Sequence, residues 1–235
     1  MKGQRYIGFS PQTSFARWGL LAIGLGIVLG VTLPTAIGGL AETFVSHPDM
    51  FPWYVTRIMA FIAYLAIAGS VIYGLLLSTK ILDVLLHRPV TYALHQDLAS
   101  VGILFAVLHI GALLFDHFVP FTLIDVIVPF IGPYRPLAIA AGQLAIITVV
   151  VVTGSFYVRR RIGQKRWRSI HVFAFIAFIA VTAHGIAAGT DTSMPWAFAI
   201  YVGAAATVAF LLGVRLTLLV AKRSAEGAVA GLPVS

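Results

Sequence analysis

The chain has 235 residues, of which 60% are hydrophobic and only 10% are charged, whereas soluble domains are about half apolar and about a quarter charged. It contains no cysteine, which excludes disulfides, thiolate catalysis and cysteine-ligated clusters. The formal net charge of +8 does not indicate nucleic-acid binding, because the basic residues lie in short segments between long apolar runs. The composition therefore predicts an all-α integral membrane protein that contacts the lipid bilayer and no nucleic acid.

The first apolar run covers 18–41 and follows a basic, polar stretch at 1–17. It is too long for the apolar core of a signal peptide, and no small-residue cleavage site follows it. We therefore expect 1–17 to be a cytoplasmic tail and 18–41 to be a retained membrane helix.

Five further runs reach the length of about 20 apolar residues that a membrane-spanning helix needs. With the first run they predict a six-transmembrane-helix bundle over 18–220, followed by a cytoplasmic tail at 221–235. The connection at 118–133 is itself apolar and is interrupted by Pro120 and Pro129, so we expect a re-entrant or interfacial piece over one end of the bundle. The five runs are roughly 54–78, 96–115, 135–158, 169–189 and 196–220, and a helix can extend a few residues beyond its apolar run.

The distribution of lysine and arginine predicts the orientation, because these residues are enriched in the cytoplasmic loops of membrane proteins. If the N-terminus is cytoplasmic, all of the 16 lysines and arginines except Arg57 and Arg135 fall on the cytoplasmic side. We therefore predict a multi-pass protein of the cytoplasmic (inner) membrane with both termini in the cytoplasm. In that topology the third and fifth helices run in the same direction.

Four of the seven histidines fall on these two helices. His95 and His109 belong to the third helix, and His171 and His184 belong to the fifth. Ionisable residues inside a membrane are costly and usually functional. Because the helices run in the same direction, we expect His95 to face His171 and His109 to face His184. Each pair can supply both axial ligands of a haem iron, so the pattern predicts two b-type haems between the third and fifth helices.

The residues between the histidines of the third helix support this interpretation. His95 and His109 are fourteen residues apart, nearly four helical turns, so they share a face and lie ~21 Å apart along the axis. On the same face, Ala99, Gly102 and Ala106 stand between them. A flat macrocycle must lie close to the helix that ligates it, and these small side chains leave room for it.

The fifth helix does not follow the same rule. His171 and His184 are thirteen residues apart, and on an ideal helix that spacing rotates the second side chain by about 220° from the first. Either this helix is tilted or locally rewound, or the two cofactors are approached from different sides.

The residues around these histidines resemble the ferric reductase-like transmembrane domain, the six-helix cytochrome b module of ferric reductases, NADPH oxidases and the haem subunit of the bacterial methionine sulfoxide reductase system. The resemblance covers the second to sixth predicted helices, and a fourteen and thirteen spacing of the histidines is a hallmark of that family. The segments 128–136 and 188–192 are similar to stand-alone bacterial members. The most specific stretches are RRRIG at 159–163, WRSIH at 167–171 and HG at 184–185.

The resemblance implies transmembrane electron transfer through two bis-histidine haems, an inner one on His95 and His171 and an outer one on His109 and His184. In fused members of the family, a C-terminal flavin- and nicotinamide-binding domain supplies the electrons. We expect no such domain here, because the sequence has no glycine-rich dinucleotide fingerprint. The donor is then a separate flavoprotein or a membrane quinol, and the acceptor lies on the outer side. We expect a haem subunit of a larger redox complex, and whether the chain is an enzyme by itself is left open.

Three further side chains are candidates for contact with the haems. Arg57 and Arg135, at the predicted outer side, either pair with haem propionates or extend to the lipid headgroups. Trp167 either packs on the edge of the inner haem or belongs to the interfacial belt of aromatic residues. The basic loop 159–168 is expected to contact anionic lipids, with a donor or the inner haem's propionates as a further partner.

Two other functions remain open from the sequence. The chain could be a haem-free transporter that uses the histidines for protons or metal ions, although transporters often carry internal repeats and none is visible here. It could also be a structural subunit that keeps the fold without the chemistry, although all four histidines are present.

Overall fold

The computed structural model describes residues 50–230, in which every regular element is a helix. Five helical segments there are long and apolar enough to cross a membrane, which confirms a multi-pass helical protein over the second to sixth predicted spans. The first predicted span, 18–41, lies outside the described residues. The five segments are α2 (Phe51–Thr79), α3 (Arg88–Leu113), α5 (Pro136–Ile162), α6 with α7 (Gln164–His171 and Phe173–Ala188) and α8 (Pro195–Ala230).

Prolines mark the beginnings of four of these helices, and in α2 it is Pro52 in the first turn. Pro89 lies in the first turn of α3, Pro136 begins α5 and Pro195 begins α8. A proline is tolerated there because the first N–H groups of a helix have no partner inside the helix. These prolines therefore separate the long helices without weakening them.

Two short 3₁₀ helices, η2 (Ile81–Val84) and η3 (Thr190–Ser193), lie in the connections. The connection from α5 to α6 is a single residue, Gly163, with φ +85°. Only glycine adopts that backbone conformation without steric cost. It lets α6 begin directly after the arginines that end α5, where positive charge is favourable near the helix C-terminus.

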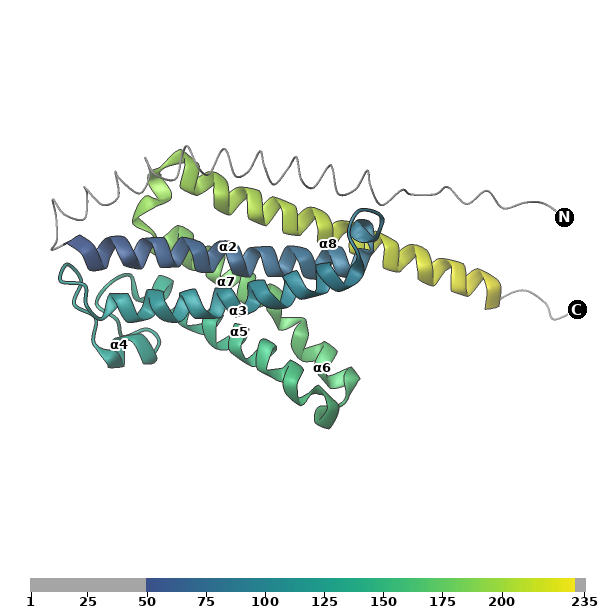
Figure 1. The fold of residues 1–235 in the computed structure, drawn as a ribbon, viewed down its shortest axis with the longest axis horizontal. Coiled ribbons are helices and arrows are strands. Elements are labelled where there is room, and N and C mark those ends of the chain that lie inside the picture. Colours follow the sequence, from purple (N-terminus) through teal and green to yellow (C-terminus); the bar gives the residue numbers. More distant parts are fainter. Residues whose placement is uncertain (1–49, 231–235) are drawn as a thin grey trace, which may run out of the picture. The chain divides into compact units, whose positions relative to one another are not determined.

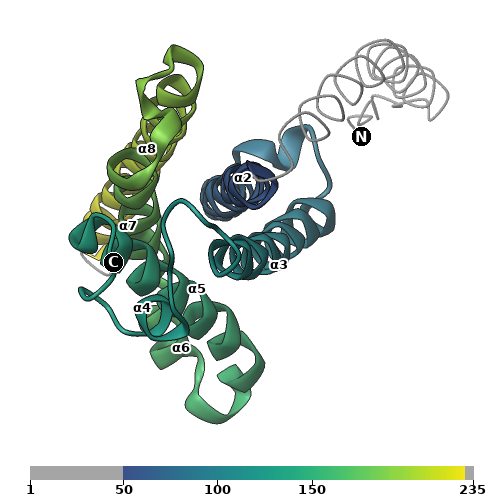
Figure 2. The same ribbon diagram turned by 90° about the vertical axis from the view of Figure 1, so that its left-hand side faces the viewer.

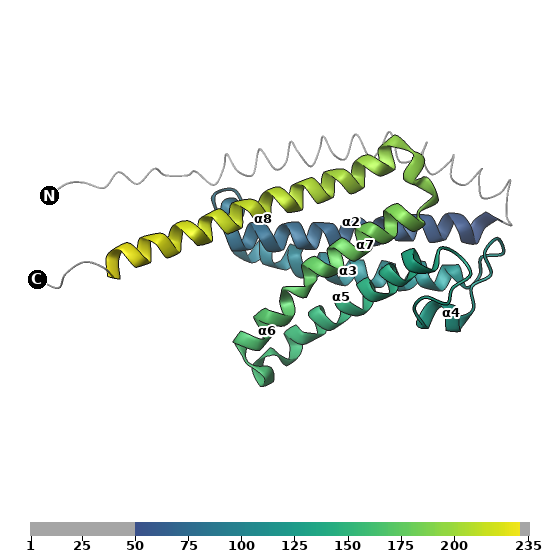
Figure 3. The same cartoon turned by 180° about the vertical axis from the view of Figure 1, so that it is seen from behind.

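Consecutive long helices run in opposite directions (Figures 1 and 3), so α3 and α7 run in the same direction, as the sequence predicts. Seen end-on in Figure 2, α2 and α3 lie side by side, and α5, α7 and α8 form a row beside them. Two clusters of buried side chains join the groups. One links α2, α7 and α8 through residues that include Tyr64, Leu75, Phe178 and Tyr201, and the other links α2, α5 and α7 through Ile67, Val149 and Ala177.

The outward faces of the helices remain apolar. Leu104, Ile147, Ile179 and Phe210 are each more than half exposed, as are many other large apolar side chains. A water-soluble protein rarely exposes apolar surface on this scale. This exposed apolar surface indicates contact with lipid, which a helix can cross because its backbone groups bond to one another.

The apolar connection 118–133 carries a short helix, α4 (Leu123–Ile127). Thr122 and Asp125 close it with a capping box, in which each side chain accepts a hydrogen bond from the other residue's backbone N–H. The buried amide of Gln143 on α5 donates to the carbonyl oxygens of Asp125, at 2.8 Å, and Val126, at 2.7 Å. These bonds hold the connection against α5, as a covering piece at one end of the helices.

Candidate functional site

The four intramembrane histidines come together in two pairs between α3 and the α6–α7 segment. The ring centroids of His95 and His171 lie 5.9 Å apart, and those of His109 and His184 lie 6.3 Å apart. The rings of the two pairs are inclined at 74° and 71°. The partners are those expected from the sequence, and each pair takes one histidine from each of two co-directional segments.

These separations suit two imidazoles on opposite sides of one metal ion. An imidazole nitrogen binds a metal at about 2 Å. Two such bonds in line, with roughly 1 Å from each nitrogen to the centre of its ring, place the ring centres roughly 6 Å apart. The ring separations of both pairs lie near this value.

A break in the fifth predicted span brings its two histidines to the same partner helix. His171 is the last residue of α6, and α7 begins at Phe173. At the break, the N–H of Phe175 donates to the carbonyl of Val172, three residues earlier, instead of four. A bond of this kind winds the chain more tightly than an α-helix. The helix is thus locally rewound just after His171.

Three of the four imidazoles donate a hydrogen bond to the backbone of a neighbouring helix. The Nδ1 atoms of His95 and His109 lie 2.8 Å and 2.9 Å from the carbonyl oxygens of Ser70 and Thr56, both on α2. The Nδ1 of His184 lies 2.8 Å from the carbonyl oxygen of Ala138 on α5. Thus α3 is anchored to α2, and α7 is anchored to α5, through the histidines themselves.

These bonds decide which ring nitrogen is free. A carbonyl oxygen can only accept, so each of the three rings carries its proton on Nδ1, and Nε2 keeps its lone pair. Histidines that bind metals almost always donate their other ring N–H to a carbonyl or carboxylate, which fixes the ring and makes the ligand more basic. The three rings therefore have the hydrogen bonding that is typical of metal-ligating histidines.

His95 and His171 have different neighbours. The hydroxyl of Ser70 donates to the carbonyl of His95 at 2.9 Å, so the two residues are joined twice. The ring of Trp167 lies 5.2 Å from the ring of His171, at 31°. The buried Nε1 of Trp167 has no hydrogen-bond partner within the described residues, which leaves a donor beside His171.

Cavities border the His109–His184 pair. Two adjoining cavities of about 190 Å³ and about 370 Å³ are each lined by both of these histidines. The larger is almost entirely apolar, with Ala106 and Gly142 among its walls. Space of this kind, next to two free imidazole nitrogens, can hold a flat apolar group.

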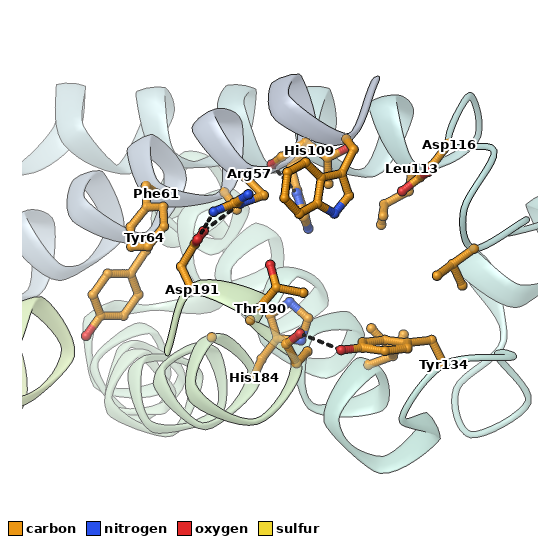
Figure 4. Close-up of a pocket in the computed structure, with 18 of the residues that line it drawn as sticks. Arg57, Phe61, Tyr64, His109, Leu113, Asp116, Tyr134, His184, Thr190 and Asp191 are labelled. Atoms are coloured by element: carbon orange, nitrogen blue, oxygen red, sulfur yellow. Dashed lines mark hydrogen bonds and ion pairs between the residues drawn. The ribbon is translucent and has the colours of Figure 1, made fainter. Parts of the chain in front are cut away.

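Polar side chains line the smaller of the two cavities beside His109 and His184 (Figure 4). Arg57 forms an ion pair with Asp191, in which Nε donates to Oδ2 at 2.6 Å, and its guanidinium lies 4.0 Å from the centre of the Trp53 ring. The hydroxyl of Tyr134 donates to the carbonyl of Ala188 at 3.3 Å. The pairing of Arg57 with Asp191 was not predicted from the sequence.

Arg135, the second basic residue predicted at this end, donates to the carbonyl of Ala187 at 2.5 Å and lies over the ring of Tyr134. It thus satisfies a carbonyl at the C-terminal end of α7, where a positive charge is favourable. Contact of Arg57 or Arg135 with a propionate stays a prediction.

The small residues of α3 lie between its two histidines, as expected, but they do not all have the same neighbours. A Cβ atom at Gly102 would come within 2.7 Å of the Ile67 side chain and 3.3 Å of its backbone nitrogen. Gly102 therefore allows α3 to approach α2 closely. Ala106 lines the larger cavity, while Ala99 is half-buried.

Within residues 50–230, no group of three or more histidine, aspartate or glutamate side chains is placed to hold a bare metal ion. The site therefore consists of two pairs of imidazoles and the space beside them. Comparison with protein-family models, characterised proteins and solved structures found no match to this chain.

Proposed function

We propose that the protein carries electrons across a membrane through two bis-histidine b-type haems, one between His95 and His171 and one between His109 and His184. The observation that carries this proposal is that three of the four imidazoles donate a hydrogen bond through Nδ1, as metal-ligating histidines do. The ring centres of each pair are also separated by about the distance expected for two imidazoles that bind one iron. Transfer through such a chain needs only that the sites be held in place.

The number of protein ligands favours haem over a bare metal ion. Protein sites for bare transition metals usually use three or four side-chain ligands, and each site here offers two. A porphyrin supplies the four remaining ligands of an octahedral iron. The apolar cavities beside His109 and His184 fit the porphyrin's faces, and the unpaired Trp167 Nε1 offers a donor beside the other site.

When bound, haem supplies an iron that gains and loses one electron, and the chain supplies the rest. The four histidines would hold the iron, and in His95, His109 and His184 the nitrogen left free for it is Nε2. The carbonyl oxygens of Ser70, Thr56 and Ala138 orient three of these rings. The surrounding apolar walls exclude water, and a low dielectric constant keeps each site sensitive to nearby charge.

The charges at the two ends support an orientation with the α5–α6 turn in the cytoplasm. That turn carries Arg159, Arg160 and Arg161 and is followed by further basic residues, whereas the opposite end has the Arg57–Asp191 pair. By the positive-inside rule, His95 and His171 lie on the inner side and the C-terminus in the cytoplasm, and we propose that the membrane is the cytoplasmic one. A separate flavoprotein or quinol donates electrons, and an acceptor outside receives them.

Topology can be tested directly because the chain has no cysteine. Single cysteines at the exposed positions Ser193 and Gln164 lie at opposite ends of the helices. A membrane-impermeant maleimide applied to intact cells is expected to label Ser193→Cys and to leave Gln164→Cys unlabelled until the membrane is opened. The reverse labelling contradicts the orientation.

Electron transfer can be tested in sealed vesicles that contain ferricyanide. Dithionite added outside is expected to reduce the trapped ferricyanide at least tenfold faster with the wild-type protein than with empty vesicles. The His109→Ala variant, incorporated to the same density, is expected to return the rate to nearly that of empty vesicles. Equal rates for the wild type and the variant contradict a route through this pair.

A further inference from the structure

We infer that Gly74 on α2 and Gly142 on α5 are positioning residues for the ligands His95 and His184, each leaving the space that lets one imidazole reach its backbone carbonyl. The inference rests on the proposed function, since it concerns how the proposed ligands are held. Gly74 and Gly142 lie on the neighbouring helices, each four positions after the residue whose carbonyl the histidine contacts.

The geometry of a helix explains why these positions matter. A serine or threonine side chain in a helix can bond to the carbonyl four residues earlier, which means that the side chain at position i+4 stands beside the carbonyl of residue i. A donor from another helix reaches that carbonyl only if the side chain at i+4 is small. The carbonyl acceptors here are Ser70 and Ala138, and the residues four positions later are Gly74 and Gly142.

The contact is closest at Gly142. A Cβ atom there would lie 2.7 Å from Nδ1, 2.8 Å from Cγ and 2.9 Å from Cε1 of His184. Such distances are shorter than van der Waals contact, so the ring would have to move. It is not free to move without losing its 2.8 Å bond to Ala138.

The same arrangement occurs, less tightly, at Gly74. A Cβ atom there would lie 3.2 Å from Cε1 and 3.3 Å from Nδ1 of His95. The third carbonyl, that of Thr56, is followed four residues later by Ala60, a small residue that lines both cavities beside His109. Each of the three hydrogen bonds thus passes over a glycine or an alanine.

The consequence for the cofactor follows from the hydrogen bond. A ring that donates strongly through Nδ1 is a more basic ligand and stabilises the oxidised iron. Displacing the ring by a methyl group weakens this bond and tilts the ligand. We expect the affected haem to be lost or, where retained, to show a higher reduction potential and a changed electron paramagnetic resonance signal of its ferric iron.

The test compares glycine-to-alanine substitutions in the full chain purified in detergent. Gly142→Ala is expected to affect only the haem at His109–His184, and Gly74→Ala, with a smaller shift, only the haem at His95–His171. Gly154→Ala is the matched control on α5, since a Cβ atom there meets nothing within 4 Å. Its haem content, potentials and resonance signals are expected to equal those of the wild type.

The outcomes separate this inference from the proposed function. A wild-type protein without haem refutes the proposed function, whatever the variants do. With two haems in the wild type, unchanged haem content, potentials and resonance signals in both Gly142→Ala and Gly74→Ala refute the inference alone. Simultaneous loss of both haems from one variant also refutes it, because each glycine is assigned to a single imidazole.

Discussion

The two histidine pairs use the same side chains at similar separations but are held in different ways. In the His109–His184 pair, both rings donate to carbonyls of neighbouring helices. In the His95–His171 pair, only His95 does so within the described residues, and His171 lies against Trp167. The rings of His109 and His184 are thus each fixed by a hydrogen bond. In the other pair, His95 is fixed by a hydrogen bond and His171 by an aromatic ring.

The position of each histidine in its helix decides which contact holds its ring. His95, His109 and His184 lie inside helices, where the backbone is regular and an external acceptor sets the direction of the ring. His171 ends α6, where the backbone itself turns. At such a break the local winding places the ring, and packing against Trp167 replaces the carbonyl.

Of the changes that distinguish the two pairs, replacement of one histidine should have the largest effect. We expect His109→Ala to lower the haem content from two per chain to one, because the pair at the other end keeps both of its imidazoles. The remaining haem should retain its potential. Quantitative haem analysis and a redox titration measure both properties, and loss of neither haem contradicts the assignment of His109.

Breaking the Arg57–Asp191 ion pair should have the next largest effect. Asp191→Asn leaves a partly buried guanidinium without its counter-charge, and we expect a loss of about 1–3 kcal/mol of stability, between the values for exposed and fully buried pairs. The loss should be accompanied by a shift in the potential of the His109–His184 haem only. Asp83→Asn, which removes the exposed partner of Arg88 at 3.5 Å, is the control and should cost less than about 1 kcal/mol. Equal stabilities of the two variants would argue against a structural role for the Asp191 pair.

Replacing Trp167 should have a smaller effect, and it should change the haem at His95–His171 instead of the haem at His109–His184. Trp167→Ala opens the surroundings of His171 to water, which stabilises the more highly charged oxidised iron, so the potential of the His95–His171 haem should fall. The potential of the other haem should stay unchanged. Tyr157→Ala, at an exposed aromatic residue near the end of α5, should change neither potential. A shift of both haems in Trp167→Ala would show that the pairs are not supported independently.

The smallest effect concerns the covering piece near His109 and His184. Donors from the Thr122 hydroxyl and backbone N–H lower the pKa of Asp125 below its ordinary value. Because the pKa is lowered in the folded state, the stabilisation is present above the ordinary aspartate pKa and is lost as the pH falls through the lowered one. We expect amide exchange of 123–127 to accelerate in acid, after correction for the intrinsic pH dependence of exchange, and to be fast at all pH values in Asp125→Ala. Exchange in the wild type that does not depend on pH beyond that correction would contradict this role.

The sequence was sufficient for the five spans that the structure describes and for the partners of the histidines. Hydrophobic run length and prolines define the spans, and the co-direction of the third and fifth helices follows from their number. The ends of the helices were less predictable. Helix α3 begins at Arg88 rather than 96, and α8 continues to Ala230, because a hydropathy pattern marks the apolar window and a helix continues through polar residues beyond it.

The contacts that hold the four histidine rings could not be predicted from the sequence. A backbone carbonyl leaves no trace in residue type, so the roles of Ser70, Thr56 and Ala138 depend on how α2 and α5 are rotated against their neighbours. The break at Val172 was equally hidden, although the thirteen-residue spacing required some irregularity. Asp191 is visible in the sequence, but its choice of Arg57 depends on the packing of η3 against α2.

The decisive measurement is the absorption spectrum of the purified protein, recorded oxidised and reduced, together with quantification of its haem. We expect a sharp b-type band in the reduced-minus-oxidised spectrum and two haems per chain. A colourless protein that is folded and monodisperse would contradict it.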